Sequence, residues 1–234
     1  MRRVRDIRDW SALTEEDWRA SQEGERHYWT TRRDPFRLLY HAEHYFYAGF
    51  YEWTTRRALL NPFRVDPSRP DNFQIPPDEM EGRVVLEVGC GPASRTLSLV
   101  HCATVHALDS LLALHREVQS FGWSAFASLS DAPAEELPYD SESIDFVHCW
   151  KMLSLVRDPD RVLREMQRVL VPGGQLLMGV DLSGSRHPGH LHAWTVEVFE
   201  GRVLADFEAV IPIDVQDDPE RGTRVWVCRL RKRA

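Results

Sequence analysis

The sequence lacks the features that would place the chain in a membrane, outside the cell or on a nucleic acid. It has no run of about 18 apolar residues, the length that crosses a bilayer, and no apolar segment at its start typical of a secretory signal. Its four cysteines are widely spaced and form no CxxC pair, which argues against a zinc ribbon and for a reduced chain. The net charge of −7 argues against a general nucleic-acid surface. We therefore expect a cytoplasmic protein without a membrane, nucleic-acid or metal partner.

Two regions of the 234-residue chain differ in texture, and we divide it into residues 1–78 and 79–234. The first region holds 14 of the 24 aromatic residues before residue 74 and predicts helices, one near Thr14 to Glu25 and another over 34–57. The second alternates short apolar runs (RVVLEV, ATVHAL, SAFASL, IDFVHC, QLLMGV) with helical patterns, which predicts a parallel sheet covered by helices on both faces. FEAVIPIDV and TRVWVCRLR at the end predict a hairpin at the sheet edge.

The stretch VLEVGCGPASRT places two glycines directly behind the first predicted strand. Glycine lets the backbone approach a ligand closely, and the carboxyl ends of parallel strands are where such ligands bind. Asp109 ends the second predicted strand, 20 residues after Gly89, where a carboxylate can accept hydrogen bonds from a ribose diol. A dinucleotide and S-adenosylmethionine both fit, but the dinucleotide fingerprint has a third glycine where this chain has Ser94.

Four segments in order carry a family resemblance: Glu87-x-Gly89-x-Gly91, Asp109, AEELPYDSESIDFV (134–147) and VLREMQRVLVPGG (162–174). Together they resemble the class I S-adenosylmethionine-dependent methyltransferases, specifically the "type 11" small-molecule group. The resemblance implies a Rossmann-like, seven-stranded, mostly parallel sheet with one antiparallel strand near the C-terminus, to which this chain adds a helical N-terminal extension. It also implies S-adenosylmethionine as the cofactor and a small molecule as the methyl acceptor.

The resemblance further implies which residues meet the cofactor. Glu87 would order the glycine loop and the cofactor's amino group, Asp109 would hold the ribose, and Ser110 and Leu111 would lie against the adenine. The family often has an Asp where this chain has Pro133, so either Asp131 reaches the adenine or the backbone at Ala134 holds it. The full cofactor set is Glu87, Gly89, Cys90, Gly91, Asp109, Ser110, Leu111, Asp131, Ala134 and Cys149.

Residues after the fourth predicted strand would face the acceptor. Trp150 either walls the pocket or packs in the core, and Lys151 either binds an acidic acceptor or begins a helix in solvent. The family often has Leu-Glu-His a few residues on, where this chain has Leu-Ser-Leu. Tyr47 and Tyr51 lie on the aromatic N-terminal helix, which either caps the cofactor and shapes the acceptor pocket or packs on the sheet.

Three histidines follow the fifth predicted strand in HPGHLHAW: His187, His190 and His192. They have no fixed metal-ligand spacing, so we predict no metal site there. A histidine near neutral pKa suits the removal of a proton from a hydroxyl or amine, and the three are our candidate bases, with ordinary loop histidines as the alternative.

The sequence therefore predicts methyl transfer to an oxygen or nitrogen atom of a small molecule. Two other classes stay open. A nucleotide-binding oxidoreductase is disfavoured by Ser94 and the PGG segment. A catalytically silent protein that binds the cofactor or a partner is permitted by the missing Leu-Glu-His.

Overall fold

The computed structural model describes residues 13–31, 77–91, 94, 96–100, 102–118, 126–182, 190–211, 214–218 and 223–233. Within them the strands are β1 (Val84–Val88), β2 (Thr104–Leu108), β3 (Ser128–Ser130), β4 (Ile144–Trp150), β5 (Leu170–Asp181), β6 (Phe207–Ala209), β7 (Asp214–Asp218) and β8 (Thr223–Lys232). The α-helices are α1 (Glu15–Thr31), α4 (Leu112–Val118), α5 (Pro159–Val169) and α6 (Val196–Val203), and the 3-10 helices are η2 (Pro77–Met80) and η3 (Thr96–Leu99).

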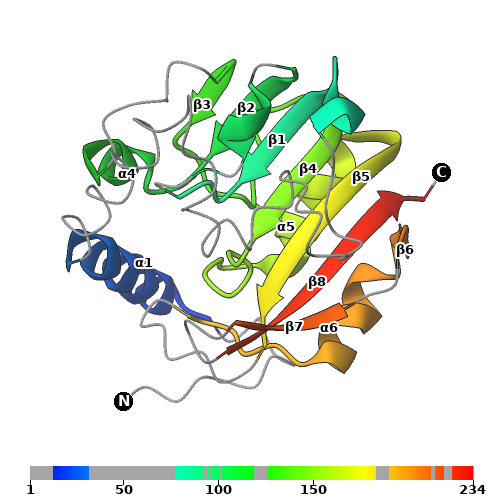
Figure 1. The fold of residues 1–234 in the computed structure, drawn as a ribbon. Coiled ribbons are helices and arrows are strands. Elements are labelled where there is room, and N and C mark those ends of the chain that lie inside the picture. The colour runs from blue at the N-terminus through cyan, green and yellow to red at the C-terminus, as the bar shows by residue number, and fades with distance from the viewer. Residues whose placement is uncertain are drawn as a thin grey trace.

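These strands form one sheet in the order β3-β2-β1-β4-β5-β8-β6, and β7 also pairs with β8 (Figure 1). β1 to β5 pair in parallel, whereas β8 runs antiparallel to β5, β6 and β7. β6 and β7 pair with different parts of β8, so the eight strands occupy seven positions. The predicted fold class, including the single reversed strand near the C-terminus, is confirmed.

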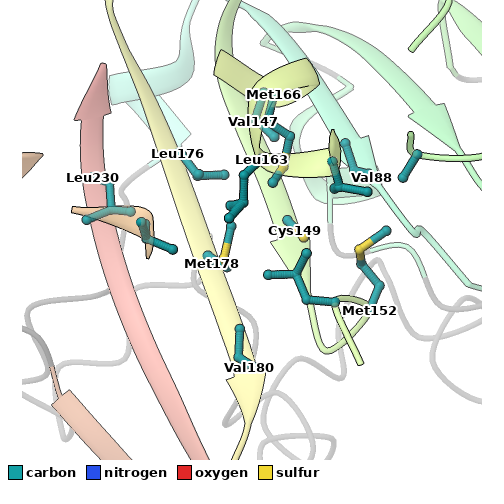
Figure 2. Close-up of a cluster of buried hydrophobic side chains, with 14 of the residues drawn as sticks. Val88, Val147, Cys149, Met152, Leu163, Met166, Leu176, Met178, Val180 and Leu230 are labelled. Atoms are coloured by element: carbon teal, nitrogen blue, oxygen red, sulfur yellow. The ribbon is translucent and has the colours of Figure 1, made fainter. Parts of the chain in front are cut away.

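Alternation along the strands gives the sheet two buried faces. Leu86 and Val88 of β1 join the cluster that includes α5, whereas Val85 between them joins the cluster that includes α4 and η3. Figure 2 shows the first cluster, where Leu163 and Met166 of α5 lie against side chains of β4 and β5. Each fully buried aliphatic side chain contributes roughly 1.5–3 kcal/mol, so this packing fixes how the strand ends are arranged.

Helix α1 begins where the sequence predicts a helix and runs six residues past Glu25, to Thr31. Thr14 and Asp17 cap it reciprocally, because the Asp17 amide donates to the Thr14 hydroxyl and the Thr14 amide donates to the Asp17 carboxylate. Figure 1 shows α1 next to α4, at the end of the sheet toward which the parallel strands point. The helix predicted over 34–57 lies outside the described residues.

Candidate cofactor and acceptor site

The two glycines after β1 have left-handed backbones and differ in what surrounds them. Gly89 has φ 73°, and a Cβ there would lie 2.8 Å from the Cβ of Met152. Gly91 has φ 55°, and no atom of the described residues would lie within 4 Å of its Cβ. Gly89 is therefore needed for close packing against the segment after β4. Among the residues that the structure describes, space is therefore open beside Gly91 at the carboxyl end of β1, where a ligand can approach the backbone.

Glu87 orders the segment that follows the glycines. Its carboxylate accepts hydrogen bonds from the Thr96 hydroxyl at 2.7 Å, from the Thr96 amide at 3.2 Å and from the Ser94 hydroxyl. His148 Nδ1 of the neighbouring strand lies 3.2 Å from its other oxygen. Burial alone would raise the pKa of Glu87, but His148, Ser94 and Thr96 outweigh burial and hold that pKa below its ordinary value. Ser94 thus donates a hydrogen bond to Glu87 from the position where a dinucleotide-binding fold has its third glycine.

Asp109 ties the glycine loop to the end of β2. Its carboxylate accepts hydrogen bonds from the amides of Gly91 at 2.9 Å and Leu111 at 2.8 Å, and His115 Nε2 lies 3.2 Å away. Burial raises the pKa of Asp109, but the charge and hydrogen bond of His115 and the two amides bring that pKa below its ordinary value. A carboxylate that is 13% exposed is therefore held ionised beside the open space at Gly91.

The remaining residues of the predicted cofactor set lie around the same edge. Leu111 and Ala134 are buried, and Ser110 donates a hydrogen bond to Gln22 of α1 at 3.2 Å. Asp131 directly follows β3 and is exposed. The two cysteines are buried, and burial raises the pKa of both thiols, so Cys90 and Cys149 are neutral at physiological pH.

Trp150 and Lys151 lie at the carboxyl end of β4. Trp150 is buried and its ring covers Gly179, where a Cβ would come within 2.6 Å of the ring. Lys151 has φ 58°, an uncommon backbone for a residue with a side chain, and its amide donates to the Gly179 carbonyl at 2.7 Å. Its ammonium lies 3.1 Å from Asp181 Oδ1, with side-chain exposures of 10% and 3%. The expectation that Lys151 begins a helix in solvent is wrong, because it enters a turn and its charge is buried against Asp181.

Of the three histidines predicted as bases, the structure describes two. His192 is buried, and its Nε2 lies 2.7 Å from the Val156 carbonyl. Burial lowers the pKa of His192 from 6.5 to about 4. This geometry favours a structural role for His192. His190 is half-buried, and His187 lies outside the described residues.

Helix α1 lies at the carboxyl edge of the sheet, next to α4 (Figure 1). Its Trp29 packs edge-on against His115 at 5.6 Å between ring centroids, beside the Gln22–Ser110 hydrogen bond. Arg157, in the segment after β4, pairs with Glu15 and lies 5.0 Å over the Trp18 ring. Helix α1 therefore lies next to Ser110 and His115, the neighbours of Asp109, while Tyr47 and Tyr51 lie outside the described residues.

Sequence reasoning missed three members of this site: His115, Asp181 and the pairing of His148 with Glu87. Asp181 had a signal, because it is an acid directly after an apolar strand, as Asp109 is. His115 lies six residues past Asp109, and nothing in its spacing marks it as a partner.

Among the described residues, no group of three His, Cys, Asp or Glu side chains is placed to hold a metal ion. Within the same residues, no helix is both long and apolar enough to span a membrane.

A doubly wound sheet with a glycine loop after β1 and an acid after β2 defines a Rossmann-like nucleotide-binding class. Residues 86–178 match the family model described as Methyltransferase domain. Over these residues the chain is therefore similar to a methyltransferase domain, in agreement with the motifs that resemble the class I S-adenosylmethionine-dependent family.

Individual relatives agree with that family. The chain is 39% identical over 108 residues to Methyltransferase GfsG of Streptomyces halstedii, a match that covers 42% of this chain and 38% of the relative. It is 31% identical over 140 residues to the ubiquinone biosynthesis O-methyltransferase of Pseudomonas putida (strain GB-1), covering 56% of this chain and 58% of the relative. The chain thus spans well under two thirds of the length of these relatives.

A solved structure shares the fold. The Burkholderia thailandensis 1,6-didemethyltoxoflavin-N1-methyltransferase, with bound 1,6-didemethyltoxoflavin and S-adenosylhomocysteine, aligns with a TM-score of 0.52 and 19% identity. The alignment covers 66% of this chain and 72% of that one.

Proposed function

We propose that this chain transfers a methyl group from S-adenosylmethionine to an oxygen or nitrogen atom of a small molecule. The observation that carries the proposal is the join between Gly91 and Asp109. The Gly91 amide is bound by the Asp109 carboxylate, and the space where its side chain would stand is open among the described residues. The names of the relatives support the same chemistry, since one is an O-methyltransferase and a structural neighbour holds S-adenosylhomocysteine with a small molecule.

The residues present fit this cofactor. Gly91 admits the cofactor's methionine portion, and Asp109 keeps lone pairs beyond those bound to the two amides, which suits it to the ribose hydroxyls. Leu111 and Ala134 provide apolar contact for the adenine. When bound, the cofactor would supply an electrophilic methyl group on a sulfonium.

The protein's own contribution is then alignment and removal of a proton. The acceptor must approach in line with the methyl group, and Trp150 at the end of β4 is our candidate for one wall of its pocket. A histidine of HPGHLHAW is one candidate base, with His190 and His187 as the stronger candidates because the ring of His192 is buried on a carbonyl.

The test begins with calorimetry of S-adenosylmethionine, S-adenosylhomocysteine and NAD. We expect the first two to bind and NAD not to bind comparably. Gly91→Val should abolish that binding, whereas Gly82→Val is the matched control: Gly82 is also left-handed with no described atom within 4 Å, but it precedes β1. Tight binding of NAD with no response to S-adenosylmethionine would refute the proposal. Cofactor binding without methyl transfer to any member of a broad acceptor panel would favour the alternative, a catalytically silent protein that binds the cofactor.

A further inference from the structure

Polar groups lie along the sheet face that α5 does not cover, where an apolar core is expected. Glu87 of β1 and His148 of β4 lie side by side, and the His148 ring is stacked with that of Trp150 at 6.0 Å and 9°. Trp150 covers Gly179 of β5, and the Lys151–Asp181 pair follows at the strand ends. The buried polar row thus runs from the cofactor loop to the carboxyl ends of β4 and β5.

The Lys151–Asp181 pair combines two features that do not favour folding. Burying both charges removes their hydration, which a single ion pair often fails to offset. Lys151 also holds a left-handed backbone, and such conformations in residues with side chains cluster at functional sites. In addition, Asp181 is the last residue of β5 and lies at the edge where parallel sheets bind ligands.

Neighbouring residues connect the Lys151–Asp181 pair to the glycine loop. Met152, the residue after Lys151, packs against Gly89, and Trp150 pairs in register with Gly179, two residues before Asp181. A group held between Lys151 and Asp181 would therefore lie on the acceptor side of the glycine loop.

We propose that the Lys151–Asp181 pair binds the reacting group of the methyl acceptor, and that this group is a neutral hydroxyl or N–H. This inference rests on the proposed function. Because Asp181 already balances the charge of Lys151, the pair has no net attraction for a carboxylate. It presents one donor and one acceptor 3.1 Å apart, which complements a group that both accepts and donates a hydrogen bond.

The reaction balances with these residues. A lone pair of the acceptor's oxygen or nitrogen forms the bond to the methyl carbon, and the sulfur–carbon bond breaks with its electron pair going to sulfur. The acceptor's proton becomes strongly acidic as that bond forms, so it passes to the Asp181 carboxylate, in place of a histidine of HPGHLHAW, and then to water. Lys151 holds the carboxylate in place, and it also donates a hydrogen bond to a hydroxyl acceptor, whose oxygen has a second lone pair besides the one that attacks the methyl carbon.

The test compares Asp181→Asn with Glu79→Gln, which alters an ion pair with Arg229 outside this edge of the sheet. Transfer from S-adenosyl-[methyl-³H]methionine is measured to catechol, aniline and benzoate. We expect Asp181→Asn to bind S-adenosylhomocysteine within about twofold of the wild type and to lose roughly 100-fold or more in transfer to catechol or aniline. Glu79→Gln should retain activity, and benzoate should be the poorest acceptor.

Each other outcome decides against one proposal. The inference is overturned if Asp181→Asn transfers the methyl group at the wild-type rate, or if the wild type prefers benzoate to the other two probes. If the wild type methylates none of the three probes, its S-adenosylhomocysteine complex is titrated with catechol. Loss of that binding in Asp181→Asn supports the inference, and absent or unchanged binding overturns it. If Asp181→Asn does not fold, Lys151→Met/Asp181→Leu removes both charges together and takes its place. Failure of the wild type to bind S-adenosylhomocysteine instead refutes the proposed function.

Discussion

Asp109 is the residue whose replacement tests the cofactor site most directly. Asp109→Ala removes the acceptor for the amides of Gly91 and Leu111, at 2.9 and 2.8 Å, and leaves the buried His115 without its carboxylate. A hydrogen bond to a charged group contributes about 1.5–3 kcal/mol. We expect the free energy of unfolding to fall by about that amount, which is roughly 3–12 °C in Tm for a chain of this size.

Asp109→Ala should also weaken the binding of S-adenosylhomocysteine. If Asp109 binds the ribose, a loss of about 1.5–3 kcal/mol corresponds to a dissociation constant roughly 10- to 150-fold higher. Calorimetry with S-adenosylhomocysteine and with its 2′-deoxy analogue separates the two roles of the carboxylate. A ribose contact makes the mutation cost more for the full ligand than for the deoxy ligand, whereas loop ordering costs both ligands equally.

Asp145→Ala is the matched control for this experiment. Asp145 also binds a backbone amide, that of Val84 at 2.8 Å, but at the start of β1 and away from the glycine loop. This variant should lose stability and keep its affinity for the cofactor. Equal losses for the two ligands in Asp109→Ala would refute the ribose contact and leave Asp109 as a residue that only orders the loop.

Two further predictions concern stability. The pKa of His192 is about 4 in the fold against 6.5 ordinarily, so the unfolded chain takes up the proton first as the pH falls, and up to about 3 kcal/mol of stability is lost between pH 6.5 and 4. Urea unfolding should show that His192→Gln removes this loss, and an identical pH dependence in both proteins would contradict the buried neutral ring. Gly89→Ala places a Cβ 2.8 Å from that of Met152, so thermal unfolding should show it less stable than Gly173→Ala, which has a similar φ of 74° and no described atom within 4 Å. Equal losses would mean that backbone strain alone makes Gly89 necessary.

The position of the candidate cofactor site could be predicted because it depends on local features. Glycines behind an apolar run and an acid after the next strand are fixed by the chain's own spacing, and parallel pairing brings both to one edge. Gly91 and Asp109 accordingly meet in the structure. The sheet class could be predicted for the same reason, since alternating strand and helix patterns leave few arrangements open.

Side-chain partners between distant segments could not be predicted in this way. His192 suits a base in sequence, yet it packs on the Val156 carbonyl 36 residues earlier in the chain. Lys151 is typical of a solvated helix start, yet the register of β4 with β5 places it against Asp181.

The sequence by itself determined the Rossmann-like sheet, the glycine loop and its acid, because periodicity and backbone freedom are properties of neighbouring residues. Only the tertiary structure decided which charges are buried together. His115 with Asp109, His148 with Glu87 and Asp181 with Lys151 are set by strand register and helix packing. The physical reason is that burial and charge pairing depend on through-space distance, which spacing along the chain does not encode.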